Sequence, residues 1–498
     1  MLVVGDWTYN RREPAHAAGK EYNTGKSSWW KTGWGVLWLY AVTALVSRAQ
    51  TFTTLASFNG TTNGLWPQAL SQGTDGNFYG TTFAGGSAPY GGTVFKITPT
   101  GTLTMLYSFT GGADGGSPGG ALVLATDGSF YGTAAFGGAH SYGTIFKISP
   151  IGMLTILYTF TGGADGGYPT SLVLGADGNL YGTTGAGDGT IFEITLGGAL
   201  TTLYTFHSAT VDVSMVVQGA SGNFYGTTYE GGAYNDGTVF KMTPRGTLTT
   251  LYSFTGGSDG GFPYGGIVIG ADGNFYGTTT GDGGAYGNGT VFTLTPAGTL
   301  TTLYSFTGRA DGSSPFGSLV QANDGNLYGT TYLGGASQPL CPSDVYGFGC
   351  GTVFRISSTG ALTTLHSFAG YPIDGAAPQS ALLQATDGNF YGTTLSGGAY
   401  NAGGLTSGYG TVFSLSMGLG PSVKTVPHSG KAGSAVIILG TNLRGASSVS
   451  FNGAAAAFSV VSATEITTTV PAGATTGKVQ VITPSGTLFS GGPFLVRR

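Results

Sequence analysis

Charged residues are scarce in this chain, and their scarcity limits what it can bind. Only 8% of the 498 residues are Asp, Glu, Lys or Arg, against roughly 25% in an average soluble domain. The formal net charge is −4, and no long run of Lys or Arg occurs that would neutralise a phosphate backbone. Nucleic acid is therefore not an expected partner.

Histidine and cysteine are also rare. The five His residues stand at unrelated places and show no metal-ligand spacing, so we expect no cofactor and no catalytic residue from them. The two cysteines, Cys341 and Cys350, flank a short loop, which in an exported protein predicts a disulfide.

A helical period is missing as well, and a repeat of about fifty residues stands in its place. Each unit has a short apolar run, an Asp-Gly turn, the phrase Phe-Tyr-Gly-Thr-Thr, a Gly-rich loop, Gly-Thr-Val-Phe, a Thr-Pro-x-Gly turn and a Leu-rich run. The Asp-Gly turn is expected to be type I′, and the Thr-Pro-x-Gly turn type I. The tyrosine of the phrase recurs seven times, at Tyr79, Tyr131, Tyr181, Tyr225, Tyr276, Tyr328 and Tyr391.

Four short strands per unit are typical of one propeller blade. The first Leu-rich run, residues 51–58, precedes every other part, whereas the last unit lacks one after Ser416. We therefore predict an all-β protein in which residues 50–417 form a seven-bladed β-propeller closed by its N-terminal strand. Such closure removes open sheet edges.

The first 49 residues differ in composition from the rest. A cationic stretch precedes an apolar run from Trp34 to Val46, and Ser47 and Ala49 follow as small residues. This order predicts a secretory signal over residues 1–49, cleaved after Ala49. A start codon further downstream stays open, and an uncleaved membrane anchor is the alternative.

The units resemble the GloVer-type tandem repeat of the "choice-of-anchor" bacterial surface proteins. Asp-Gly-Asn-Phe-Tyr-Gly-Thr-Thr, Gly-Gly-Ala-Tyr, Gly-Thr-Val-Phe-Lys and Leu-Tyr-Ser-Phe-Thr-Gly-Gly-x-Asp-Gly carry this resemblance over residues 51–416. It implies a protein exported from a bacterium, secreted or displayed at the cell surface, and brings no known activity. The expected terminal anchor is not evident in the chain, which ends at Phe494–Arg498 without an apolar tail.

Residues 419–498 resemble an IPT/TIG immunoglobulin-like domain. The resemblance rests on Pro421–Pro427, Val436–Asn442, Val449–Gly453 and Ile466–Pro471. Short alternating strands with frequent turns also predict a small β-sandwich.

Two sets of loop residues are the candidate ligand-binding residues. The inter-blade loops contribute a ring of carboxylates, and the loops after the Tyr-Gly phrase contribute tyrosines to the same face. These residues are Asp114, Asp165, Asp259, Asp311, Asp374, Tyr90, Tyr142, Tyr234, Tyr286 and Tyr400. Irregular loops add a secondary set, Tyr346, Phe348, Tyr400 and Tyr409. Aromatic rings with carboxylates suit sugar polymers, and carboxylates near carbonyls suit calcium. The alternative is that Asp only caps its own turn and Tyr only seals the seam between blades.

These patterns favour a non-catalytic exported protein that binds extracellular glycan or protein through one propeller face. Its expected partners are an extracellular polysaccharide or a surface protein, with membrane contact only through the signal or an unidentified anchor. One alternative is an enzyme acting on polysaccharides or lactones, which needs carboxylates clustered at the central channel. Another is a structural spacer in which the C-terminal sandwich binds.

Overall fold

The computed structural model describes residues 50–185, 189–206, 213–281, 283–336, 349–400 and 408–497. Within these ranges every regular element is a β-strand, and no helix is long and apolar enough to cross a membrane. The predicted signal over residues 1–49 lies outside the described residues.

Seven sheets of four or five antiparallel strands form the propeller, and each is one blade. The first two blades contain β2 (Leu65–Pro67), β3 (Ser71–Gln72), β4 (Phe78–Ala84), β5 (Thr93–Ile97), β6 (Leu103–Ser108), then β7 (Val123–Leu124), β8 (Phe130–Ala134), β9 (Thr144–Ile148), β10 (Leu154–Thr159). The third and fourth contain β11 (Pro169–Leu174), β12 (Leu180–Thr184), β13 (Thr190–Ile194), β14 (Leu200–Thr205), then β15 (Val217–Gln218), β16 (Phe224–Thr228), β17 (Thr238–Met242), β18 (Leu248–Ser253). The fifth and sixth contain β19 (Val268–Ile269), β20 (Phe275–Thr279), β21 (Thr290–Leu294), β22 (Leu300–Ser305), then β23 (Val320–Gln321), β24 (Leu327–Thr331), β25 (Thr352–Ile356), β26 (Leu362–Ser367).

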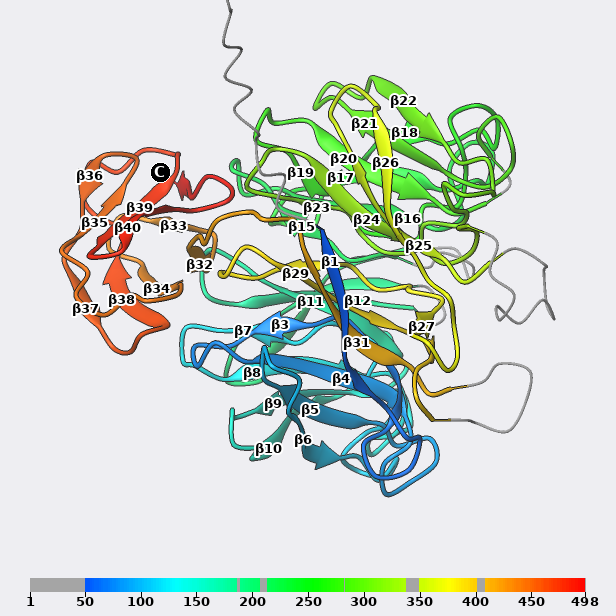
Figure 1. Cartoon of the computed structure of the whole chain (residues 1–498), viewed down its shortest axis with the longest axis horizontal. Coiled ribbons are helices and arrows are strands. Elements are labelled where there is room, and N and C mark those ends of the chain that lie inside the picture. The colour runs from blue at the N-terminus through cyan, green and yellow to red at the C-terminus, as the bar shows by residue number, and fades with distance from the viewer. Residues whose placement is uncertain are drawn as a thin grey trace, which may run out of the picture. The chain divides into compact units, whose positions relative to one another are not determined.

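The seventh blade joins the two ends of the propeller sequence. It contains β28 (Leu383–Gln384), β29 (Phe390–Thr394), β31 (Thr411–Ser416) and, as its outermost strand, β1 (Thr51–Ser57). Strand β1 pairs with β31 from Thr51–Ser416 to Ser57–Thr411, and Figure 1 shows the blue and orange strands side by side. The predicted closure by the N-terminal strand is therefore confirmed. A small antiparallel pair, β27 (Gly375–Ala376) and β30 (Ser396–Gly397), forms between the loop before β28 and the loop after β29.

A hydrogen bond joins the Asp of the Asp-Gly turn to the repeated tyrosine. In blade 5 the Tyr276 hydroxyl donates to Asp272 Oδ2 at 2.8 Å, and Asp272 Oδ1 accepts the Asn274 backbone N–H at 3.1 Å. The same hydroxyl–carboxylate bond occurs in six blades, at 2.6–2.9 Å. Burial and the neighbouring carboxylate raise the pKa of these tyrosines, for example Tyr276, so they stay neutral donors.

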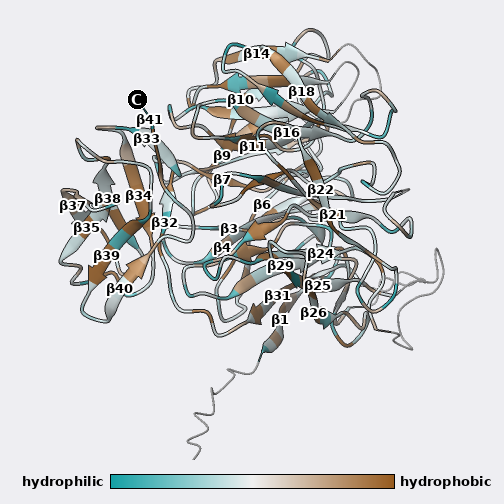
Figure 2. Ribbon diagram, turned by 90° about the horizontal axis from the view of Figure 1, so that it is seen from above, coloured by the Kyte–Doolittle hydropathy of each residue, from teal (hydrophilic) through white to brown (hydrophobic). Residues whose placement is uncertain are grey.

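The tyrosine ring also crosses to the next blade. Tyr79 stacks on Phe130 with ring centroids 4.3 Å apart, and Tyr391 reaches across the closing seam to Phe78 at 4.0 Å. Five of the seven seams have such a pair, and Leu180 and Leu327 take the place of the Phe in the other two. Adjacent blades are thus joined by apolar side-chain contacts across every seam. Figure 2 shows that hydrophobic residues concentrate on the strands.

The glycine of the phrase leaves room for the phenylalanine ring of the next strand. A Cβ built on Gly277 would lie 2.5 Å from Phe292 Cζ, and Phe292 is fully buried. A larger residue at this position would therefore displace the Phe292 ring. The second threonine then bonds to the threonine that opens the neighbouring strand, as Thr279 and Thr290 do at 2.9 Å between their hydroxyls.

The expected type I′ geometry of the Asp-Gly turn is wrong. A type I′ turn needs positive φ at both central residues. Only Gly273 has a positive φ, of 82°, and its N–H donates to Gly270 O at 2.9 Å. The turn is therefore a type I turn followed by a left-handed glycine, a form in which the Asp side chain can cap the Asn274 N–H. The Thr295–Gly298 turn closes as expected, with Gly298 N donating to Thr295 O at 2.9 Å.

The C-terminal domain is a β-sandwich with its own core. One sheet has the order β32 (Lys424–Val426), β34 (Ala435–Leu439), β38 (Glu465–Thr469), β37 (Phe458–Val460), and the other has the order β36 (Ala454–Ala455), β35 (Ser448–Phe451), β39 (Val479–Thr483), β40 (Gly486–Phe489). Strands β33 (Ser429–Lys431) and β41 (Leu495–Arg497) add a parallel pair. The core between the sheets is apolar, with Val436, Ile438, Val449, Phe451 and Val481 at its centre.

The sandwich contacts the Asp-Gly end of the propeller. Ile437 and Leu439 pack in one cluster with Leu124, and the Thr464 hydroxyl donates to Thr74 O at 2.6 Å. Lys424 lies at this junction, where burial lowers its pKa to about 8 and the charge of Asp387 opposes that shift.

A single added methyl group at Gly277 tests the packing of the phrase. We expect Gly277→Ala to lower the free energy of unfolding by about 1–3 kcal/mol, because the methyl group displaces the Phe292 ring. Gly281→Ala is the matched control, since its Cβ would meet nothing within 4 Å. Equal stability losses in the two variants, measured by chemical denaturation, would contradict this account.

The Lys424 ammonium is expected to lower stability near neutral pH. Its pKa falls from 10.5 to about 8 on folding, so the unfolded chain binds more protons between these values and stability rises with pH there. Lys424→Met should therefore raise the free energy of unfolding near neutral pH, with a gain that shrinks toward pH 10.5. Lys431→Met, at an exposed site of the same domain, should show no such pH-dependent gain.

Candidate functional site

The two ends of the propeller differ in what they carry. Because successive strands run in opposite directions, the inter-blade loops and the loops after each second strand share one end, called here the loop face. The Asp-Gly and Thr-Pro-x-Gly turns share the opposite end, where the sandwich makes its contacts. The loop face is thus where the candidate residues gather.

The inter-blade carboxylates point into their own loops. Asp311 accepts the Tyr304 hydroxyl at 3.0 Å, the Thr307 N–H at 2.7 Å and the Thr307 hydroxyl at 2.5 Å. Asp114, Asp165 and Asp259 accept the same three bonds from the equivalent Tyr and Thr residues. Asp259 is only 8% exposed. These oxygens already have partners, as the turn-capping alternative requires, and a ligand-binding role for them stays a prediction.

Charge and hydrogen bonding shift the pKa values of these pairs in opposite directions. Burial opposes ionisation of Asp311, yet the bonds from Thr307 and Tyr304 outweigh it and hold its pKa below 3.8. Burial and the bond to Asp311 raise the pKa of Tyr304 to about 12. The pair is therefore a stable donor–acceptor contact at neutral pH and has no group ready to exchange a proton.

The sixth blade keeps this contact with a different residue. His366 stands where the other units have tyrosine, and its Nε2 lies 2.9 Å from Asp374 Oδ2. The imidazole also stacks on Phe52 of β1, with centroids 3.6 Å apart and planes within 5°. His366 is therefore part of the packing around the closing strand.

The predicted tyrosines are exposed on the loop face. Tyr90, Tyr234, Tyr286 and Tyr400 are 50–81% exposed, and Tyr142 lies over Gly162 and Gly167 of the loop that holds Asp165. Tyr409 is half-buried against Gly60 and belongs to a core cluster. Tyr346, Phe348 and Cys341 lie outside the described residues, whereas Cys350 is buried and disulfide-bonded.

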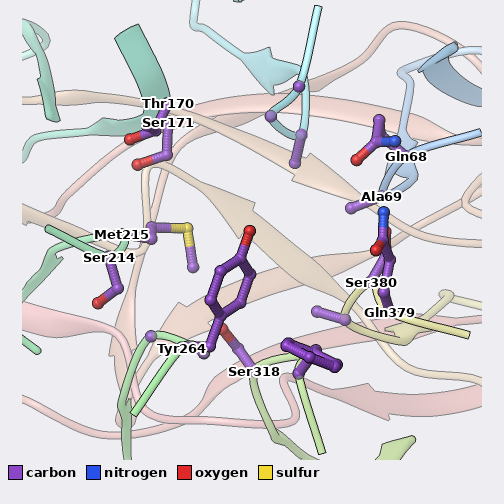
Figure 3. A pocket seen from close by; sticks show the side chains of 18 of the residues that line it. Gln68, Ala69, Thr170, Ser171, Ser214, Met215, Tyr264, Ser318, Gln379 and Ser380 are labelled. Atoms are coloured by element: carbon purple, nitrogen blue, oxygen red, sulfur yellow. The ribbon is translucent and has the colours of Figure 1, made fainter. Parts of the chain in front are cut away.

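A pocket of about 330 Å³ lies at the loop-face mouth of the central channel (Figure 3). Most of its walls are the residues that enter each innermost strand, in six of the seven blades just after the proline of the inter-blade loop. We call it the channel pocket and define it by Gln68, Gly120, Ser171, Ser214, Tyr264, Ser318 and Ser380 together with their chain neighbours. None of these blades gives a charged side chain to the described lining.

Strained backbone shapes the entrance of the channel pocket. In six inter-blade loops the residue before proline is not glycine and has φ between 52 and 59°, at Trp66, Ser117, Tyr168, Phe262, Ser314 and Ala377. Such residues cost about 1–3 kcal/mol each unless their surroundings hold them. Here hydrogen bonds do so: Phe262 N donates to Asp236 O at 2.8 Å, and Phe262 O accepts from Thr280 N at 3.2 Å. These hydrogen bonds link neighbouring blades at the rim of the channel pocket.

Aromatic side chains cover only part of this rim. Tyr229, Phe262, Tyr264, Phe316 and Tyr332 form a continuous chain of ring contacts across blades 4 to 6, called here the aromatic arc. Sequence reasoning missed the arc because it searched for what the units share. A position-by-position comparison would have found it, since Tyr264 and Phe316 stand where other units have Gly119, Thr170 or Gln379.

The sequence places this architecture in a family. The sequence profile of the Gloeobacter/Verrucomicrobia repeat matches residues 10–216 and 186–406, most of the chain. The chain belongs to the Gloeobacter/Verrucomicrobia repeat family. The IPT/TIG domain matches residues 421–496, so both predicted resemblances are confirmed. No curated protein sequence matches this member of the repeat family.

Solved structures similar to this repeat protein are propellers of low sequence identity. They include the WD40 propeller domain of Doa1 (14% identity, 74% of this chain and 97% of that one, TM-score 0.46) and a gluconolactonase from Xanthomonas campestris (12%, 74% and 89%, 0.38). Another is PorZ, a surface component of the type-IX secretion system of Porphyromonas gingivalis (14%, 89% and 61%, 0.43). At these TM-scores, none of the three indicates what the repeat protein does.

No metal centre emerges from the side chains of the described ranges, where no three His, Cys, Asp or Glu residues could together hold an ion. The carboxylate ring spreads around the propeller and does not converge. Calcium binding therefore stays a prediction.

Removing one inter-blade carboxylate tests its structural role. Asp311→Ala should lower the free energy of unfolding by about 1–3 kcal/mol at neutral pH, because the Thr307 N–H and the Tyr304 hydroxyl lose their acceptor. The folded pKa of Asp311 lies below 3.8, so this stabilisation is present above that value and is lost as pH falls through the folded pKa. Denaturation of both proteins at neutral and at acid pH measures it. A stability difference that grows toward acid pH would contradict the sign.

Proposed function

We propose that this protein is exported, secreted or held at the bacterial cell surface, and binds an extracellular glycan or protein through the loop face. The observation that carries the proposal is the exposure of aromatic side chains on that one face. Trp66, Phe136, Tyr234, Tyr264 and Tyr286 are each at least 40% exposed there. Exposed aromatic clusters on a rigid scaffold are typical of recognition surfaces.

The chemistry of the loop face favours a glycan over a protein. Tyrosine rings present a flat apolar surface beside a hydroxyl, which suits the mixed apolar and hydroxyl surface of a sugar. Charged groups, which commonly orient protein partners, are sparse on this face, and the inter-blade Asp side chains, such as Asp259 and Asp311, are already bonded within their loops. The family and the signal-like N-terminal sequence support export.

An enzyme remains the less supported function. General acid–base catalysis needs an ionisable group within reach of the substrate. The described residues that line the channel pocket carry amide, hydroxyl, thioether and apolar groups, and no carboxylate or imidazole. The loop face therefore offers recognition groups in place of catalytic ones.

A polysaccharide-array assay of the purified chain, with and without calcium, tests this function. Saturable binding to at least one bacterial or plant polysaccharide is expected. A variant with Tyr90→Ser, Tyr234→Ser and Tyr286→Ser should bind the polymer roughly tenfold more weakly, since each aromatic contact is worth about 0.5–1.5 kcal/mol.

The matched control lies on the opposite end of the propeller. Ile151 and Met153 in a Thr-Pro-x-Gly-type turn are 80% and 71% exposed, so Ile151→Ser with Met153→Ser removes a similar apolar surface. This control should bind as the parent does. Binding lost equally in both variants, or no binding to any glycan by the folded parent, would contradict glycan recognition by the loop face.

A further inference from the structure

The channel pocket has the size and position of a ligand site. Its volume of about 330 Å³ lies at the small end of the range of about 300–1,000 Å³ typical of ligand pockets. Blades from around the whole ring contribute to it, so it exists only once the propeller is closed. A small ligand, or one end of a larger one, fits such a site.

The lining of the channel pocket is uncharged. Its polar groups are the hydroxyls of Ser, Thr and Tyr, the amides of Gln68 and Gln379, and the backbone of Gly-rich segments. A carboxylate, phosphate or ammonium entering it would lose hydration without gaining an opposite charge. The pocket therefore selects an uncharged ligand.

Tyr264 forms a fixed platform on one side. Figure 3 shows its ring projecting into the pocket from the blade 5 segment. T-shaped contacts with two other rings hold it, with centroids 6.0 Å from Tyr229 and 5.2 Å from Phe316. A ring that is 55% exposed and yet packed against two neighbouring rings keeps its orientation before a ligand arrives.

Polar side chains next to this platform retain hydrogen-bonding capacity. Ser318, Gln379 and Ser380 lie beside Tyr264 in Figure 3, and within the described residues their side chains make no hydrogen bond. Ser171 and Ser214 across the pocket bond instead to Thr183 and Thr227 in their own blades. The unused donors and acceptors are therefore concentrated on the side of blades 6 and 7.

We propose that the channel pocket binds one end of an uncharged glycan. The apolar face of a sugar ring lies on Tyr264, and its hydroxyls bond to Ser318, Gln379 and Ser380. A platform with hydroxyl and amide groups around it matches a sugar ring, whereas an apolar peptide anchor would leave those groups unpaired. This inference rests on the proposed glycan recognition and narrows it to one subsite and to neutral sugars.

The test uses short neutral oligosaccharides, chosen from those the parent chain binds on the array, in solution calorimetry. Tyr264→Gln is the test variant because Gln379 occupies the same place in blade 7, so the backbone accepts this side chain. We expect roughly tenfold weaker binding or complete loss. The control, Ile151→Gln, changes a residue that is 80% exposed on the opposite end of the propeller, and this variant should bind the short oligosaccharide as the parent does.

A second variant keeps the test informative if Tyr264→Gln loses its fold. Ala121→Trp fills the pocket from blade 2 without altering the arc and should also abolish binding. Unchanged affinity in either folded variant would overturn the pocket assignment while leaving glycan binding by the loop face in place. A parent chain that binds no neutral glycan, or that prefers uronic acid polymers, would also overturn it. Of these outcomes, only a parent that binds no glycan at all removes the proposed glycan recognition too.

Discussion

The contact between a tyrosine of one blade and a phenylalanine or leucine of the next is the interaction on which the structure depends. A blade alone has two apolar faces and cannot bury either. The Tyr79–Phe130 stack and its equivalents bury both, and the Tyr391–Phe78 stack does so where the two ends of the ring meet. The Asp-Gly turn sets the tyrosine's position through its carboxylate. Closure, the channel and the channel pocket all follow from these seams.

Interior residues repeat from unit to unit, whereas residues at the loop face vary between units. Residues in the interior of the blades are nearly constant from unit to unit, because each meets the same partner, as Gly277 meets Phe292 within blade 5. The residue after the inter-blade proline lines the mouth of the channel and varies between Gly119, Thr170, Tyr264 and Gln379. A ring of nearly equal blades thereby acquires a pocket with one aromatic side.

The few charges of the chain stabilise turns and do not form a surface field. The carboxylates of Asp272 and Asp311 each accept hydrogen bonds from a tyrosine hydroxyl and from backbone or threonine donors. A face with few charges attracts ligands mainly through apolar contact and hydrogen bonding, which vary little with salt. This distribution fits an uncharged polymer better than an ionic one.

The sequence by itself determined the all-β class, the seven blades, the closing strand and the sandwich, because each depends on local turn chemistry and on counting repeats. It assigned the Asp-Gly turn the wrong type, because the Asp side chain caps a type I turn that competes with the two-residue type I′ hairpin. It did not reveal the aromatic arc. Tyr229, Tyr264 and Phe316 are at least 35 residues apart along the chain, and the packing of blades 4 to 6 brings their side chains together. Which polar groups keep free hydrogen-bonding capacity was likewise decided by the tertiary structure, because that capacity depends on neighbours from other blades.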